Sequence, residues 1–245
     1  MRRPCIVFVV AAVLLSWVGT AQATSYATLT AKWVSVDPGC EVHYVNSPCN
    51  DGSFYVGMYW LKGLSQTPSP PVSPVPSLLG DIPIYCIDTY QWANTGTGTY
   101  TVADLADGPA GNGAPAMGAT KAAYLKDLIY HHYSVNADDA NKAAFAAAVW
   151  EIVYENVAWN VADGNMTVAL TPAETTTANA WLAALSTHDH GNTAFALIST
   201  GPYQDYAIAL GGGGEPIPEP LTLLAIGSGV AGIGAYIRKR RLALA

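Results

Sequence analysis

The sequence predicts an α+β domain that combines a small β-sheet or barrel with a bundle of about three helices. Three observations carry this prediction. Strand-like alternation dominates up to about residue 92, helical periodicity follows from about residue 118, and strand-like patterns return before four glycines at 211–214. Strands, then helices, then strands within 245 residues are typical of one α+β domain. An N-terminal signal peptide and a C-terminal membrane-spanning tail are expected to flank it.

The N-terminal segment 1–23 has the three parts of a secretory signal peptide. Two arginines form its basic start, an apolar stretch follows, and Ala21 and Ala23 give the small-x-small pattern of a cleavage site. The alternative is a permanent N-terminal helix, which the small residues at the end of the apolar stretch disfavour. We expect cleavage after Ala23, so that the Sec export machinery delivers a domain of residues 24–210.

The first strands are expected over 26–37 and 53–61, where alternation coincides with β-branched and aromatic residues. Five prolines then fall within 65–77, which excludes a helix or a central strand and predicts an extended, exposed loop. Another strand is expected over 82–92, with Cys86 in its middle. A connection rich in glycine, alanine and proline leads from there to the helical part.

Helix patterns begin with apolar residues spaced near 3.6 over 118–133. A second helix is expected over about Ala137–Val157, with Asn136 as its N-cap.

A third helix has the clearest start, because Thr171, Pro172 and Glu174 match an N-cap, a first helical position and a capping box. One or two strands over 194–210 complete the domain. The Gly/Pro-rich linker at 211–217 then separates it from the tail.

The charge of the domain excludes one class of partner. Residues 24–210 contain five lysines, no arginine and sixteen carboxylates, which gives a formal net charge of −11. Such a surface repels the phosphate backbone of nucleic acids, so no nucleic-acid binding is expected.

After loss of the signal peptide the chain keeps an odd number of cysteines, Cys40, Cys49 and Cys86. Turn-forming residues flank Cys40 and Cys49, which predicts one short disulfide loop in an oxidising compartment. Cys86 is then left alone. We favour a buried, unreactive thiol for it, and a reactive thiol is the alternative.

Two histidine clusters, His131–His132 and the His-Asp-His triplet at 188–190, raise the question of metal binding. Adjacent histidines on a helix point in different directions and do not share one metal face. The triplet has the composition of a polar loop. We therefore expect solvated histidines and neither a metal nor a cofactor.

No pattern in the sequence indicates an enzyme. Glu151 and Glu155 are spaced i, i+4 and are interpreted as solvated helix charges. A nucleophile elbow, a zincin helix and a phosphate-binding glycine loop are missing from the sequence. The alternative is an envelope enzyme that acts on polysaccharide through a carboxylate pair, but the sequence identifies no such pair.

The C-terminal segment 218–241 closely resembles a PEP-CTERM sorting tail. The matching residues are the Pro218-Glu219-Pro220 motif, the apolar stretch 221–237, and the basic cluster Arg238, Lys239, Arg240 and Arg241. The resemblance implies a protein that exosortase, a membrane protease-transpeptidase, processes near the Pro-Glu-Pro motif. Mature proteins of this kind join the cell surface or an exopolysaccharide matrix of Gram-negative bacteria.

The apolar stretch 221–237 is long enough for a short membrane span, since 17 residues at 1.5 Å each reach about 26 Å. The basic cluster would hold residues 242–245 in the cytoplasm. A permanent single-span anchor is therefore the alternative to a transient inner-membrane tether that presents the processing site.

The domain resembles bacterial Cys-Gln thioester domains of surface adhesins. The resemblance rests on four segments, "YCID" at 85–88, residues 121–133, residues 143–156 and "YQDYAIAL" at 203–210. In that family a strand cysteine condenses with a helix glutamine four residues before a tryptophan. Cys86 matches the cysteine and Trp150 the tryptophan, but Ala146 stands at the glutamine position and has no carboxamide.

The resemblance thus implies a scaffold that has lost its covalent chemistry. We expect a non-catalytic adhesion or biofilm-matrix protein, whose partner is an exopolysaccharide or another surface matrix component. The alternative is a covalent adhesin that still uses Cys86.

Overall fold

The computed structural model describes residues 24–37, 41–47, 52–110, 114–156, 159–188 and 190–210. The strands are β1 (Ser25–Val36), β2 (Glu41–Asn46), β3 (Gly52–Val56), β4 (Tyr59–Thr67), β5 (Gly80–Cys86), β6 (Thr97–Asp104), β7 (Thr167–Val168), β8 (Ala194–Ser199) and β9 (Tyr206–Ala209). The helices are a 3-10 turn (Leu105–Asp107), α1 (Gly118–His132), α2 (Asp139–Tyr154) and α3 (Pro172–Ala184).

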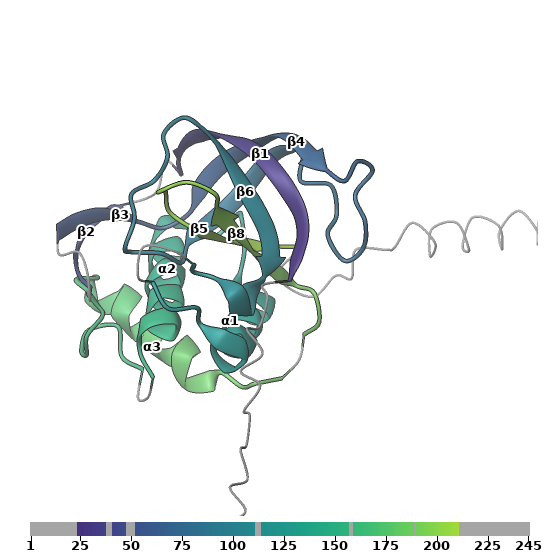
Figure 1. Cartoon of the computed structure of the whole chain (residues 1–245). Helices are drawn as coiled ribbons and strands as arrows, with labels where there is room; N and C mark the ends of the chain where they lie inside the picture. Colours follow the sequence, from purple (N-terminus) through teal and green to yellow (C-terminus); the bar gives the residue numbers. More distant parts are fainter. Residues whose placement is uncertain are drawn as a thin grey trace, which may run out of the picture.

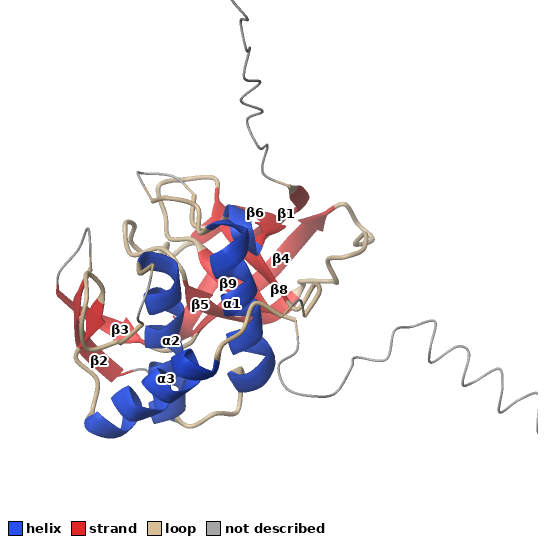
Figure 2. Cartoon of the chain, turned by 90° about the horizontal axis from the view of Figure 1, so that it is seen from below, coloured by secondary structure: helices blue, strands red, loops and turns tan. Residues whose placement is uncertain are grey.

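Six strands form a closed antiparallel barrel in the order β1-β4-β5-β9-β8-β6 (Figure 1). A second sheet has the order β3-β2-β7. The three α-helices lie together on one side of the barrel, and the view from below shows them in front of it (Figure 2). The predicted α+β class, with a barrel and three helices, is confirmed.

The chain leaves the barrel twice and returns each time to a neighbouring strand. The hairpin β2–β3 is inserted between β1 and β4, and these two strands pair with each other. All three helices are inserted between β6 and β8, which also pair. The barrel therefore supports two separate insertions, and the candidate site lies beside the first of them.

Strand β1 forms because its apolar residues alternate with polar ones. Ala27, Leu29 and Ala31 are buried at every second position, as one face of a barrel strand requires. Strand β4 approaches the proline-rich segment so closely that a Cβ on Gly63 would lie 1.8 Å from the carbonyl oxygen of Leu78. Only glycine fits this contact.

Helix α2 is the centre of the structure. Most of its residues are buried, since β5 packs on one side and α3 on another. Its Lys142 forms a buried ion pair with Asp37 at 2.9 Å, and the same carboxylate accepts a hydrogen bond from the indole of Trp60 at 3.1 Å. The pair joins the helical layer to the barrel.

The helix ends follow their capping residues. The capping box of α3 is confirmed: Glu174 accepts the N–H of Thr171 at 2.7 Å, and the Thr171 hydroxyl accepts the N–H of Glu174 at 3.4 Å. The N-cap prediction for α2 was wrong, because Asp138 rather than Asn136 caps it by accepting the N–H of Asn141 at 2.8 Å.

Three strands were not predicted, namely β2, β6 and β7. The segment 53–61 also forms two strands rather than one, with a break at Gly57 and Met58. Turn-forming residues around β2 and glycines at the start of β6 disfavour a strand prediction for either segment. Both segments form strands because pairing with neighbouring strands outweighs local propensity there.

The sequence predicts an exposed loop over residues 65–77, but the structure shows that this proline-rich segment is partly buried. Residues 65–67 still belong to β4, and Val75 and Leu78 are buried. Gln66 holds the segment in place, since its carbonyl oxygen accepts the N–H of Leu78 at 2.8 Å and its amide donates to the Pro76 carbonyl at 3.1 Å.

Among the described residues, none of the helices has the length and apolar character needed to cross a membrane.

Candidate functional site

Cys86 is the last residue of β5, not the middle of a strand as predicted. Strand β9 holds it in place through pairing with Tyr206. Its side chain is buried, and the thiol donates to the backbone carbonyl of Asp88 at 3.2 Å. The chain turns away from the barrel immediately after it.

The surroundings of Cys86 keep it protonated. Burial raises the pKa of the Cys86 thiol well above its ordinary value, and the nearby Asp88 carboxylate raises it further. The indole of Trp150 lies beside the sulfur without meeting the geometry of a full hydrogen bond. This contact and the backbone of Asp88 offset only part of the rise in pKa. Because the thiolate is the nucleophilic form, this thiol is a poor nucleophile.

Helix α2 covers β5 with the residues that the thioester resemblance singled out. Phe145 packs on Tyr85 with ring centroids 4.6 Å apart. Ala146 is buried one helical turn before Trp150 and contributes only a methyl group. Cys86 and Ala146 thus belong to the same packed layer of β5 and α2, and the residue at the glutamine position has no group with which a thiol condenses.

Two buried carboxylates lie near Cys86 and order the loops around it. Asp88 accepts the N–H of Tyr90 at 2.8 Å, and Asp205 accepts the N–H groups of Ala110 and Ser199, both at 2.7 Å. Burial raises the pKa of Asp88 to about 6 and that of Asp205 to about 7. Their hydrogen bonds to backbone groups indicate a structural role.

An open groove lies beside the β2–β3 insertion. Its volume is about 450 Å³, and aromatic side chains dominate it. Trp92 is 65% exposed and packs on Phe54 at 5.4 Å between ring centroids, while Trp33 packs on Tyr59 at 5.5 Å. The lining residues are Trp33, Val36, Ser53, Phe54, Tyr55, Tyr59, Trp92, Ala93, Thr95 and Gln204. Among these described residues, none carries a charge.

A small cavity continues the groove toward α2. The two share Phe54, Tyr59 and Gln204, and the cavity adds Trp150 and Gln91 to its lining. Its volume of about 30 Å³ has room for one or two water molecules. Cys86 lines neither space, so the groove gives a ligand access to aromatic rings and amides rather than to the thiol.

The interpretation of Glu151 as a solvated charge was wrong. Its side chain is 1% exposed, and one carboxylate oxygen accepts the N–H of Asn160 at 2.8 Å. Glu155 lies at the end of α2 and accepts backbone N–H groups of Asn165 and Met166. The two glutamates therefore fasten the segment after α2.

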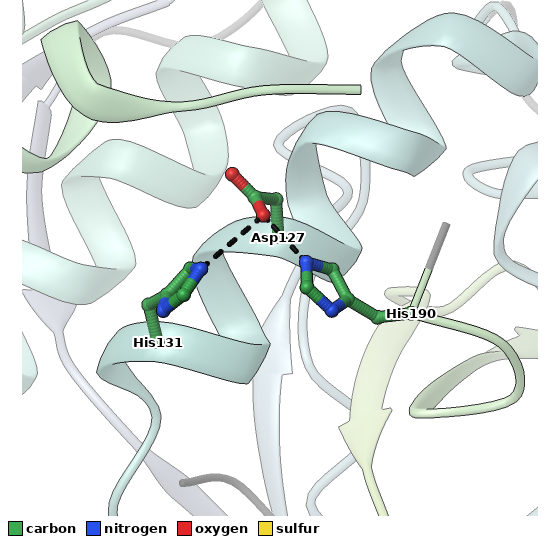
Figure 3. A group of neighbouring side chains, drawn as sticks. All are labelled: Asp127, His131 and His190. Atoms are coloured by element: carbon green, nitrogen blue, oxygen red, sulfur yellow. Dashed lines mark hydrogen bonds and ion pairs between the residues drawn. The ribbon is translucent and has the colours of Figure 1, made fainter. Parts of the chain in front are cut away.

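The two histidine clusters meet in the folded chain, where the rings of His131 and His190 lie 5.6 Å apart, centroid to centroid. His131 of α1 and His190 of the loop after α3 both lie against Asp127 (Figure 3). The spacing of Asp127 and His131 at i, i+4 is the one signal in the sequence that points to a shared face. His132 turns elsewhere and stacks on Trp181, with ring centroids 4.7 Å apart.

Several predicted sites lie outside the described residues. They are the signal-cleavage residues Ala21 and Ala23, the disulfide pair Cys40 and Cys49, the motif Pro218, Glu219 and Pro220, and the basic cluster 238–241.

Comparison of the chain with models of protein families, with curated proteins and with solved structures finds no match.

Proposed function

We propose that this chain is an exported protein of the cell surface or extracellular matrix, whose domain binds neutral polysaccharide without forming a covalent bond. The aromatic groove is the observation that carries the proposal. Exposed aromatic rings stack on the apolar faces of sugar rings, and Trp92 offers such a face to solvent. The absence of charge among the described lining residues favours neutral sugars, and the net charge of −11 over residues 24–210 disfavours acidic ones.

The state of Cys86 supports binding rather than covalent attachment. The thiol is buried and faces Asp88, and Ala146 provides no carboxamide for a thioester. Intact-mass spectrometry separates the two possibilities, because a thioester costs the chain one ammonia. A chain that is lighter by one ammonia, and that takes up an added amine, would favour the covalent adhesin instead.

Export and processing complete the proposal. The N-terminal segment directs the chain to the Sec machinery, and an exosortase-type transpeptidase removes the tail after transient attachment to the inner membrane. The intact mass of the mature protein from its native envelope tests this. Cleavage after Ala23 and near Pro218 supports the proposal, whereas a tail kept at full mass indicates a permanent anchor.

Binding is tested with the exopolysaccharide of the producing cells and with neutral glucan oligosaccharides as defined probes. Replacement of Trp92 by alanine is expected to weaken binding about tenfold, which corresponds to about 1.4 kcal/mol, whereas Trp92→Phe keeps most of the affinity. Tyr130→Ala is the matched control, since Tyr130 is an exposed aromatic residue outside the groove. Equal loss in both alanine variants, or no binding of any neutral glycan, refutes the assignment.

A further inference from the structure

Three potential metal ligands meet where α1 ends. Asp127 and His131 lie one turn apart on α1, and His190 approaches from the loop before β8 (Figure 3). One ligand atom of each residue lies within 4.8 Å of the other two. The Oδ1 atom of Asp127 is 2.5 Å from Nε2 of His190 and 3.5 Å from Nε2 of His131.

Two of these side chains are held in position by further contacts. The second oxygen of Asp127 accepts the backbone N–H of Ser186 at 2.7 Å and its hydroxyl at 3.3 Å. The ring of His190 stacks on Tyr130, with centroids 4.1 Å apart and planes inclined by 14°. Such outer contacts orient the ligands of metal sites. His131 is different, because its side chain is 53% exposed and leaves the cluster open to solvent.

The electrostatic setting favours a cation. Asp127 and His131 lie in the last turns of α1, where the backbone carbonyls give the helix end a partial negative charge. The carboxylate of Asp127 is buried, with 3% of the side chain exposed. Among the described residues, the groups that contact it are His131, His190 and Ser186. His132 lies further away and interacts with its charge, and no lysine lies within ion-pair distance.

We propose that Asp127, His131 and His190 form a binding site for one divalent transition-metal ion, represented by Zn²⁺. Two imidazole nitrogens and one carboxylate oxygen are a ligand set that zinc and its neighbours in the first row accept. This site goes beyond the proposed polysaccharide binding and does not depend on it, because its residues lie outside the aromatic groove.

The two separations that involve Asp127 fit with a small adjustment, and the ligand nitrogens of His131 and His190 lie within 4.8 Å of each other. Tetrahedral zinc with bonds of about 2.0–2.1 Å places its ligand atoms about 3.3 Å apart. The pair Asp127–His131 already has this separation, and His190 has to move away from Asp127 by about 0.8 Å. The metal ion takes the place of the hydrogen bond between Asp127 and His190, and the neutral ring of His190 then carries its proton on Nδ1.

A bound ion would join α1 to the loop that leads into β8 and would leave one coordination position open. Because the side chain of His131 is exposed, this open coordination position would face solvent. The ring of His188 lies 4.9 Å from the ring of His190, centroid to centroid, and is the nearest described candidate to fill it.

The test is a calorimetric titration of the full chain, stripped of metal with a chelator, with Zn²⁺ alone. One ion per chain is expected to bind. The variant His131→Gln is expected to lose about 100-fold in affinity or more, because it removes a ligand. It is the most informative variant, since the half-exposed side chain contributes little to packing. The melting temperature of the zinc-free protein should therefore stay close to that of the wild type, and the rise on zinc addition should disappear.

His132→Gln is the matched control, because it removes the neighbouring histidine, whose ring stacks on Trp181 outside the cluster. It should keep the wild-type affinity. Titration with Co²⁺ gives an independent readout, since the visible absorption of cobalt reports its coordination geometry. Failure of the wild-type chain to bind Zn²⁺ at one equivalent overturns the proposal. So does wild-type affinity in His131→Gln, or an equal loss in His132→Gln.

Discussion

Glu151→Gln is expected to stabilise the domain above neutral pH. Glu151 lies in the middle of α2 and is 1% exposed. One oxygen accepts the N–H of Asn160, and the other has no hydrogen-bond partner among the described residues. Burial raises the pKa of Glu151 to about 7; the Asn160 contact opposes this, and the charges of Glu155 and Asp163 add to it. Glutamine keeps the acceptor for Asn160 and removes the charge.

The size of the effect follows from proton linkage. The folded state holds a proton on Glu151 up to about pH 7, while the unfolded state releases it near pH 4.5. Between these values the unfolded chain binds fewer protons, so the free energy of unfolding falls as pH rises. The difference between the two pKa values corresponds to a loss of about 3 kcal/mol in the free energy of unfolding. Glu151→Gln should therefore match the wild type at pH 4.5 and exceed it by up to about 3 kcal/mol at pH 8.

Urea unfolding at pH values from 4.5 to 8.5 measures this difference. The matched control is Asp139→Asn, which removes an equal charge from an exposed position in the first turn of α2. Its pH profile should parallel that of the wild type. Asp88 and Asp205 also have raised pKa values, so part of the decline with pH remains in Glu151→Gln. A variant that is less stable than the wild type at pH 8, or a control with the same gain, refutes the reasoning.

Two further changes test the packing between the barrel and its insertions. Lys142→Met is expected to cost about 3–5 kcal/mol in urea unfolding, because it removes the buried cation 2.9 Å from the Asp37 carboxylate. Adding Asp37→Asn should recover part of the loss, and an additive double variant contradicts this. Gly63→Ala is expected to lower the melting temperature and cost about 3 kcal/mol or more, since its Cβ would overlap the Leu78 carbonyl. An unchanged melting temperature shows that the proline-rich segment is not packed against β4.

Elements with a strong internal pattern could be predicted from the sequence alone. Helix α1 has an apolar stripe, α3 has a complete capping box, and β1 alternates along its length. Strands β2 and β6 are harder to recognise, because turn formers flank the short β2 and glycines lie just before β6 and at its second position. They are strands because a neighbouring strand supplies hydrogen-bond partners, and the order of strands in a barrel cannot be read from one segment.

The candidate site depends on contacts between distant segments, which explains what was missed. Trp33, Phe54, Tyr59 and Trp92 come from four parts of the chain and line one groove only after the barrel closes. Asp127 and His190 are 63 residues apart in sequence. Cys86 and Ala146 could be named in advance because each belongs to a short motif, whereas the burial of the thiol depends on α2 and β9.

The position of Trp150 connects the burial of Cys86 with the opening of the groove. Its side chain is buried, lines the cavity at the inner end of the groove, and lies beside the Cys86 sulfur. A ligand in the groove therefore meets the rings of Phe54 and Tyr59, and Trp150 separates it from the thiol. A covalent adhesin needs the reverse arrangement, with its reactive bond open to an incoming amine. The buried thiol, which is part of the core, and the open groove thus support the proposal of reversible binding.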